Sequence, residues 1–290
     1  MRHQTQTPES LTTDRVVVLE DGRRLAYDEY GDPAGAPVLM LHGTPGSRVT
    51  AAILHDSALA AQVRVIAVDR PGYGLSDPRP ALTFANYADD LRQLLDTLRL
   101  ATVAVAGISG GGGYALGCAC EIPERLTRVV LVSALVPVPG EMRRQLPRVL
   151  RAGAWAARYA PAVLAAALRW AMRRDGGQLP ANVPAADRRL MERTDVHHTL
   201  VERTREEVRR QGVAAIVRDL RLYAQRPAGG LADILVPVDI VHGRDDANVP
   251  VAVAEWVQGQ IPQSGLVVAD GAGHLMIVEQ PGLLYRLVRR

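Results

Sequence analysis

The 290-residue sequence contains no lysine, only two cysteines and no long uninterrupted hydrophobic run. All 34 basic residues are arginine, a bias typical of a GC-rich coding genome. The formal net charge is only +3, so the composition does not indicate nucleic-acid binding. The polar N-terminus lacks the apolar segment of a signal peptide, and no apolar stretch has the length of a membrane span. We therefore expect a cytoplasmic monomer or homodimer without a nucleic-acid or membrane partner.

The sequence also lacks a pattern for a disulfide or a metal site. Cys118 and Cys120 are two residues apart in a predicted helix, where neighbours on one face are three or four apart. We expect two buried thiols there. The adjacent His197 and His198 are poorly spaced for chelation from a helix, so we expect them on a solvated face. No metal or organic cofactor is expected.

The order of the apolar segments predicts an α/β fold. After a disordered tail, residues 1–13, two strand-like runs at 15–19 and 25–30 flank a hairpin turn. Four short valine-rich runs follow, at residues 38–41, 63–68, 103–106 and 129–132. Helical patterns at residues 87–98 and 111–120 lie between some of these runs. The unbroken apolar character of the runs suits strands that are buried on both faces of a sheet. We predict a doubly wound, mostly parallel sheet.

The strand pattern stops between residues 134 and 230. Nearly a hundred residues are too many for a loop, and we predict helices in this stretch at 148–159, 162–174, 186–194 and 200–222. Strand and helix patterns resume at residues 238–241, 251–261, 266–269 and 281–290. We therefore predict a core formed by residues 14–133 and 231–290, with an inserted helical cap at 134–230.

The main chemical signal is Gly-Ile-Ser-Gly-Gly at residues 107–111, directly after a predicted strand and before a helix. This strand–turn–helix context is the one that the G-x-S-x-G nucleophile motif requires. Small residues must flank the serine because the turn is tight. We predict that Ser109 stands at the carboxyl edge of the sheet, above the start of a helix whose dipole favours negative charge.

Two further residues complete a hydrolytic constellation. A serine hydroxyl needs a base to take its proton, and the base needs a partner to orient it. His274 lies in a glycine-rich loop after one predicted strand, and Asp246 lies in the loop after another. Catalytic groups of open α/β sheets collect at this edge. We predict Ser109 as nucleophile, His274 as base and Asp246 as the orienting acid.

These motifs resemble the α/β-hydrolase fold family, and specifically its members with a helical cap. The matching segments are residues 41–46, 69–76, the serine turn, the Gly-x-x-Asp loop and the Gly-x-Gly-His loop. The resemblance covers residue 15 to the C-terminus except the cap. It implies that the acid is Asp246, three residues after the loop glycine, and Asp245 is the alternative.

The resemblance also implies an oxyanion hole formed by the backbone N–H groups of Gly110 and Thr44. His42 is expected to brace the loop of Thr44 and not to act as a second base. Tyr73 is expected either to pack in the core or to face the pocket. Residues of the cap that are candidates for a substrate pocket are Trp155, Tyr159, Trp170 and Tyr223.

The predicted function is a serine hydrolase that cleaves a small or medium apolar ester, lactone or related acyl compound. A helical cap typically encloses a pocket for a small-molecule substrate. The basic cap residues are Arg143, Arg144, Arg148, Arg151, Arg173 and Arg174. We expect them on a solvated face, with binding of a carboxylate-bearing substrate as the alternative.

Other chemistries remain open at this point, because one fold supports many reactions. The resemblance extends to C–C bond hydrolases, proline-releasing peptidases, perhydrolases and enzymes that cyclise or rearrange their substrates. It also extends to binding proteins that have kept the fold without turnover, although such proteins commonly lose part of the triad. Aspartate-dependent relatives that open epoxides or displace halides are excluded, because Ser109 occupies the nucleophile position.

Overall fold

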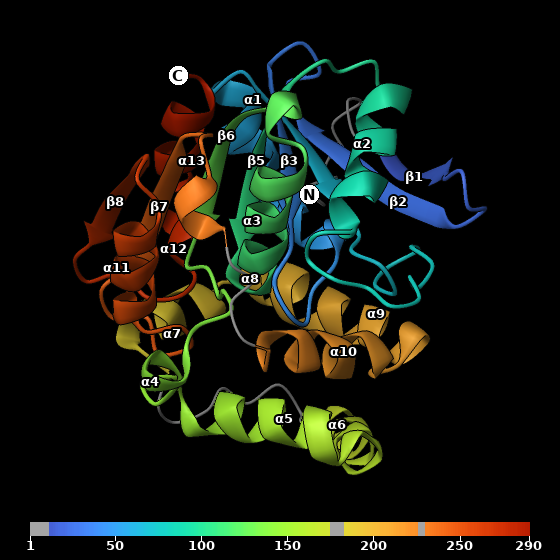
Figure 1. The fold of residues 1–290 in the computed structure, drawn as a ribbon, viewed down its shortest axis with the longest axis vertical. Coiled ribbons are helices and arrows are strands. Elements are labelled where there is room, and N and C mark those ends of the chain that lie inside the picture. Colours follow the sequence, from blue (N-terminus) through green and yellow to red (C-terminus); the bar gives the residue numbers. More distant parts are fainter. Residues whose placement is uncertain (1–11, 175–182, 226–229) are drawn as a thin grey trace, which may run out of the picture.

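The computed structural model describes residues 12–174, 183–225 and 230–290, and eight strands form one sheet in the order β1-β2-β4-β3-β5-β6-β7-β8 (Figure 1). Strands β1 and β2 run antiparallel to each other, β2 is antiparallel to β4, and the remaining neighbours are parallel. The strands are β1 (Thr12–Val18), β2 (Arg24–Gly31), β3 (Ala36–Leu41), β4 (Val63–Val68), β5 (Val103–Ile108), β6 (Leu126–Val132), β7 (Val238–Gly243) and β8 (Ser264–Ala269). The predicted doubly wound, mostly parallel sheet is therefore confirmed.

Helices cover both faces of the sheet, which explains the unbroken apolar runs in its central strands. Successive residues of a strand point to opposite faces. In β3, Leu39 and Leu41 pack into one apolar cluster, and Val38 and Met40 pack into the other. The first face is covered by α2 (Tyr87–Thr97), α3 (Gly112–Glu121) and α11 (Val251–Gln260). The second face is covered by α1 (His55–Ala60), α12 (Met276–Glu279) and α13 (Pro281–Val288).

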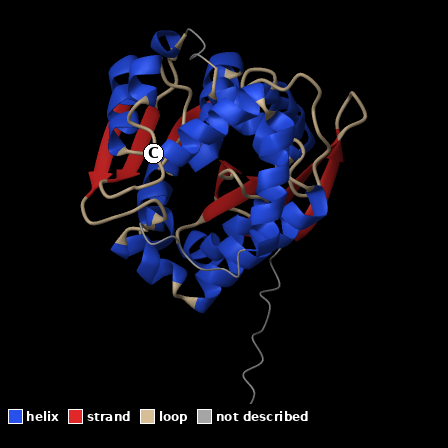
Figure 2. Ribbon diagram, turned by 90° about the horizontal axis from the view of Figure 1, so that it is seen from below, coloured by secondary structure: helices blue, strands red, loops and turns tan. Residues whose placement is uncertain are grey.

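The described residues between β6 and β7 form helices and connecting loops without a strand, and the α-helices lie beyond the carboxyl ends of the parallel strands (Figures 1 and 2). The 3-10 turn η5 (Leu231–Asp233), just before β7, contacts α3 of the core. The helices of the insertion are α4 (Gly140–Arg143), α5 (Arg148–Tyr159), α6 (Pro161–Arg174), α7 (Ala185–Met191), α8 (Thr194–His197), the π-helix η4 (His198–Arg203), α9 (Thr204–Gln211) and α10 (Ala214–Tyr223). We refer to this helical insertion as the cap. In the described part of the chain, no helix is long and apolar enough to cross a membrane.

Several sequence-based expectations need correction. The segment predicted as one helix over 200–222 is broken at Gly212, whose φ of +79° ends α9 before α10 begins. Strand β1 begins at Thr12, inside the predicted tail, while residues 1–11 lie outside the described residues. Cys118 is buried as expected, but Cys120 is exposed because it lies near the end of α3. Helix α1 and the 3-10 helix η1 (Arg48–Leu54) were not predicted.

Candidate active site

Ser109 occupies a strained turn between β5 and α3, with φ of +49°. Positive φ is unfavourable for residues with a Cβ, and strained serines of this kind occur at functional turns. Glycines make the turn sterically feasible. A Cβ on Gly107 would lie 2.8 Å from Ala115 Cβ, and a Cβ on Gly111 would lie 2.2 Å from Leu41 O. The sequence Gly-x-Ser-x-Gly is therefore a packing requirement of this elbow.

His274 and Asp246 are in direct contact. The loop after β7 carries Asp246 and the loop after β8 carries His274, and the distance from His274 Nδ1 to Asp246 Oδ2 is 2.8 Å. The other carboxylate oxygen of Asp246 accepts the backbone N–H groups of Asn248 at 2.8 Å and Val249 at 2.9 Å. Asp245, the alternative acid, is exposed. The structure thus brings Asp246, not Asp245, against the histidine ring.

The hydrogen bonds to Asp246 also determine its charge. Burial raises the pKa of the Asp246 carboxyl, but hydrogen bonds from His242 and His274 outweigh burial and hold this pKa below its ordinary value. The carboxyl is therefore an acceptor at neutral pH. His274 Nδ1 must then carry a hydrogen, which leaves Nε2 of an uncharged ring free to accept a proton.

Ser109 and His274 line the same cavity, which has a volume of about 320 Å³. Within the part of the chain that the structure describes, no hydrogen bond joins the Ser109 hydroxyl to the His274 ring. Such bonds are often long in ligand-free enzymes and tighten when substrate binds. Loops that are far apart in the sequence therefore place Ser109 and His274 at the same cavity.

The backbone segments of Thr44, which lines the cavity, and Gly110, which follows Ser109, lie next to each other. A Cβ on Gly110 would lie 3.0 Å from Thr44 N, so the two backbone segments are in close contact. Gly110 is in the first turn of a helical segment, where N–H groups lack intrahelical partners. A Cβ on Gly43 would lie 3.6 Å from Ser109 Oγ, which places the Thr44 loop directly beside the serine.

His42 also lines the cavity, but both of its ring nitrogens are engaged. Nε2 accepts the backbone N–H of Arg70 at 3.1 Å, so Nδ1 carries the hydrogen and donates it to Gly43 O at 2.8 Å. Burial and the Arg70 guanidinium hold the pKa of His42 well below its ordinary value. A neutral ring with both nitrogens bound braces the loop and is unsuited to act as a base.

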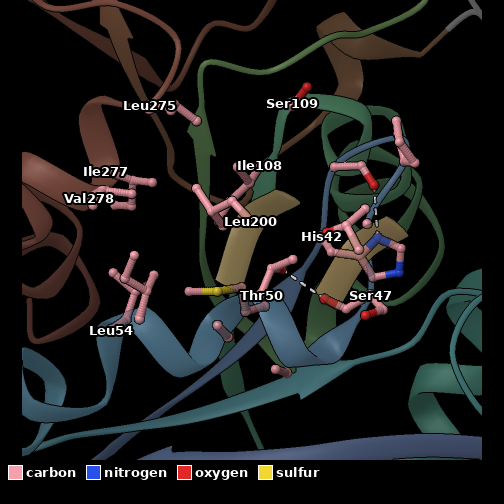
Figure 3. Close-up of a pocket in the computed structure, with 18 of the residues that line it drawn as sticks. His42, Ser47, Thr50, Leu54, Ile108, Ser109, Leu200, Leu275, Ile277 and Val278 are labelled. Carbon is pink, nitrogen blue, oxygen red and sulfur yellow. Dashed lines mark hydrogen bonds between the residues drawn. The ribbon is translucent and has the colours of Figure 1, made fainter. Parts of the chain in front are cut away.

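Most of the cavity wall is aliphatic (Figure 3). Figure 3 shows Leu54, Leu200 and Ile277 around one space, with Ser109 at its upper edge in this view. The aliphatic lining residues are Met40, Ala51, Ile53, Leu54, Ala67, Ile108, Leu200, Leu275, Ile277 and Val278. Leu200 comes from η4, so the cap contributes to the wall.

Arg48 is the cation in the lining, and acidic residues surround it. Its guanidinium pairs with Asp69 at 2.6 Å, Asp28 at 2.9 Å and also Asp14. Each of its three nitrogens donates to a different carboxylate, Nε to Asp28, Nη1 to Asp69 and Nη2 to Asp14. Among the described lining residues, no other arginine is available to bind an anionic substrate. Nor do the described residues include a group of three or more His, Cys, Asp or Glu that would hold a metal ion.

The sequence signature of the Alpha/beta hydrolase family matches residues 38–287. The chain belongs to this family. An uncharacterized protein of Mycobacterium tuberculosis strain H37Rv is 29% identical over 93% of this chain and 78% of the relative. The 2-hydroxy-6-oxononadienedioate/2-hydroxy-6-oxononatrienedioate hydrolase of Burkholderia vietnamiensis is 29% identical over 92% of this chain and 90% of that enzyme. A thermophilic esterase from Thermogutta terrifontis has a TM-score of 0.65 and 26% identity, covering 96% of this chain and 97% of the esterase.

The aromatic residues predicted to line a pocket in this α/β hydrolase lie outside the cavity. Trp155, Tyr159 and Trp170 on α5 and α6 are 62%, 64% and 59% exposed. Tyr223 is buried, and its hydroxyl donates to Gly110 O at 2.9 Å. Tyr73 is buried too, and its hydroxyl donates to Asp219 Oδ2 at 2.9 Å. The alternative expectation for Tyr73, packing in the core, is therefore the one that the structure supports.

The remaining histidines and arginines of the cap lie away from the cavity. His198 pairs with Glu202 at 2.9 Å on the exposed surface, and His197 lies 3.6 Å from the same carboxylate. The basic residues Arg144, Arg148, Arg151 and Arg173 are exposed, and Arg143 is partly buried, while the side chain of Arg174 lies outside the described residues. None of the five arginines whose side chains are described lines the cavity.

Two buried carboxylates of the cap were not predicted from the sequence. Asp187 of α7 accepts the backbone N–H groups of His274 at 2.8 Å and Leu275 at 2.9 Å. Asp219 of α10 accepts four hydrogen bonds and is fully buried. From the sequence, an aspartate within an arginine-rich helix suggests a surface ion pair. Only the three-dimensional contacts show that Asp187 and Asp219 are buried instead.

Proposed function

We propose that this α/β hydrolase is a serine hydrolase that cleaves a small or medium, uncharged ester or lactone through an acyl-enzyme. The observation that carries the proposal is the 2.8 Å contact between His274 and Asp246 at the cavity that Ser109 also lines. A nucleophile at a strained elbow, a histidine base and an orienting carboxylate are the components of a serine-hydrolase triad.

In the proposed acylation step, His274 Nε2 takes the proton of Ser109 as Oγ attacks the carbonyl carbon of the substrate. A bond forms between Oγ and that carbon, and the carbonyl π electrons move to oxygen. The N–H groups of Thr44 and Gly110 stabilise the resulting oxyanion. Each such donor contributes about 10²–10³-fold to turnover in related chemistry. Asp246 stabilises the imidazolium that forms.

Collapse of this intermediate breaks the bond to the leaving alcohol, which receives its proton from His274 Nε2. The acyl group is then an ester of Ser109. In deacylation, His274 takes a proton from water, the hydroxide oxygen attacks the same carbonyl carbon, and the oxyanion forms again. Breakage of the bond to Oγ returns the proton to Ser109 and releases the acid.

The cavity supports the proposed substrate class. A volume of about 320 Å³ is near the lower limit of ligand pockets, roughly 300–1,000 Å³. Its aliphatic wall favours an apolar acyl or alcohol group. Arg48 is already paired with three carboxylates, so an anionic substrate would displace an existing ion pair or remain uncompensated. Both alternatives are unfavourable in a desolvated site.

A second candidate function is hydrolysis of a C–C bond next to a carbonyl. It is favoured by the 29% identity to the Burkholderia hydrolase over nearly the full length of both chains. That relative's substrates, as named, are dioates, whereas the cavity of this chain presents no unpaired arginine among its described lining residues. Within this alternative, an uncharged diketone is therefore the better fit.

The test is labelling of the folded protein with a fluorophosphonate, followed by mass spectrometry of its peptides. We expect a single adduct on Ser109 and none in Ser109→Ala. Ester, lactone, amide and vinylogous-diketone substrates are then compared by kcat/KM, and esters or lactones are expected to give the highest value. A folded protein that binds apolar ligands but shows neither an adduct nor turnover would overturn the proposal in favour of a binding role.

A further inference from the structure

Asp219 of the cap helix α10 is a fully buried carboxylate that accepts four hydrogen bonds from the core. Its Oδ2 accepts Arg70 Nη1 at 2.5 Å, the Thr44 hydroxyl at 2.9 Å and the Tyr73 hydroxyl at 2.9 Å. Its Oδ1 accepts the Tyr114 hydroxyl at 2.7 Å. A buried charge is expensive unless it is paired and fully hydrogen-bonded. The four hydrogen bonds meet this requirement, and they join α10 of the cap to a buried polar network of the core.

The donors of this network are held in their protonated forms. Burial and Asp219 hold the pKa of Tyr73 and of Tyr114 well above the ordinary phenol value. Burial lowers the pKa of Arg70, but Asp219 and the surrounding tyrosine hydroxyls together outweigh burial and raise this pKa above the ordinary guanidinium value. Arg70 also lies over the Tyr73 and Tyr114 rings, at 4.8 and 4.7 Å from their centroids. The guanidinium is therefore fixed in position and always charged.

Arg70 transmits this rigidity to the peptide between Gly43 and Thr44. Its Nη2 donates to Gly43 O at 2.8 Å and to the Thr44 hydroxyl at 2.7 Å. His42 Nδ1 donates to the same carbonyl at 2.8 Å. In a planar trans peptide, the C=O and N–H bonds point in opposite directions. Two donors on the Gly43 carbonyl therefore direct the Thr44 N–H away from Arg70.

We propose that Asp219 is a positioning residue of the cap, which orients the Thr44 N–H toward the substrate oxyanion by holding Arg70 and the Thr44 hydroxyl. The inference rests on the proposed serine-hydrolase function. If Asp219 has this role, the orientation of one oxyanion donor, the Thr44 N–H, depends on the packing of α10 against the core. Tyr223, one helical turn further along α10, donates to Gly110 O, so the same helix also contacts the segment of the second N–H donor.

The test compares Asp219→Asn with Asp90→Asn, using p-nitrophenyl butyrate as substrate. Asp90, on α2, is the matched control, because it is also fully buried and pairs with two arginines, Arg23 and Arg79. We expect Asp219→Asn to lower kcat by about 10–100-fold, less than complete loss of an oxyanion donor, with KM unchanged within about threefold. Asp90→Asn is expected to keep the wild-type kcat per folded molecule, even if its melting temperature falls.

A second readout separates positioning from general loss of stability. A trifluoromethyl ketone with a propyl chain adds to the serine and forms an oxyanion, whereas the corresponding methyl ketone measures ground-state binding. Asp219→Asn is expected to weaken inhibition by the trifluoromethyl ketone in proportion to the loss in kcat/KM, and to leave binding of the methyl ketone unchanged. Equal weakening of both inhibitors would overturn the inference.

Thr44→Val provides an independent variant if Asp219→Asn does not fold. It removes the hydroxyl that contacts both Asp219 and Arg70 and keeps the backbone N–H and the branched shape. We expect the same selective loss of kcat. An active wild-type enzyme with normal kcat in both folded variants would overturn the positioning role alone. An inert wild-type protein without an adduct on Ser109 would overturn the proposed function, and the inference with it.

Discussion

The carboxylate of Asp187, on cap helix α7, accepts the backbone N–H of His274 at 2.8 Å. It also accepts the N–H of Leu275, and a Cβ on Gly273 would lie 2.4 Å from its Oδ1. The loop that carries the candidate base is thus attached to the cap by a buried side chain. Asp219 attaches the Thr44 loop to the cap in the same way. In this structure, the cap is part of the framework of the site as well as part of the cavity wall.

The first prediction concerns Asp187→Asn. Each N–H group binds a different carboxylate oxygen, and the amide keeps only one of these oxygens. One partly buried donor therefore loses its partner, at a cost of about 1–3 kcal/mol in the free energy of unfolding. Displacement of His274 by about 1 Å is expected to lower kcat up to about 100-fold. Urea unfolding and ester kinetics measure the two effects. Asp195→Asn is the control, because Asp195 forms an exposed pair with Arg193 and should change neither. A wild-type kcat in Asp187→Asn would contradict the coupling.

The second prediction distinguishes the two candidate acids. In Asp246→Asn the amide no longer enforces the Nδ1–H tautomer of His274, and kcat is expected to fall by about 10⁴-fold, as for the equivalent change in other triads. Asp245→Asn is expected to leave kcat unchanged, since Asp245 is exposed and makes no described side-chain contact with His274. Both variants are measured with the same ester. The reverse pattern would assign the acid to Asp245.

The backbone of the site was largely predictable from the sequence, because it depends on local rules. The serine elbow needs glycines on either side of Ser109, and the valine-rich runs before and after it are the buried strands that such an elbow joins. The loop positions of Asp246 and His274 follow from the parallel order of β7 and β8. Each of these features can be recognised from a segment of about ten residues.

The role of the cap was not predictable, because it depends on contacts between residues far apart in the chain. Asp219 meets Thr44 across 175 residues and Asp187 meets His274 across 87. Helical periodicity identifies a buried face but not its partner. Trp155 and Tyr159 were candidates for the pocket as aromatic residues of the cap, yet they are exposed, and the cavity wall is mostly aliphatic.

The third prediction tests the packing requirement of the elbow. In Gly111→Ala, the added Cβ would lie 2.2 Å from Leu41 O, a backbone atom of β3 that cannot move aside. We expect little or no soluble folded protein, or a large loss in the free energy of unfolding. Gly259→Ala on α11 is the control. Nothing lies within 4 Å of its added Cβ, and alanine in a helix is expected to stabilise by about 0.5–1 kcal/mol. Normal expression of Gly111→Ala with full activity would contradict the described elbow.

The fourth prediction follows from the lowered pKa of Asp246. Its folded-state pKa lies below the ordinary value of 3.8, so with falling pH the unfolded state takes up the proton first. The stabilisation from the ionised carboxyl is therefore complete above about pH 4 and is lost progressively as the pH falls further, toward the folded-state pKa. We expect the free energy of unfolding of the wild-type protein to decline with falling pH below this point.

Asp246→Asn lacks this titration, so its free energy of unfolding is expected to depend less steeply on pH in the same acidic range. Urea unfolding at a series of pH values measures the difference between the two slopes, which removes the contributions of the other carboxyls. Asp245→Asn should keep the wild-type slope. Parallel curves for the wild-type protein and Asp246→Asn would mean that the hydrogen bonds from His242, His274 and the 248–249 backbone do not favour the ionised form.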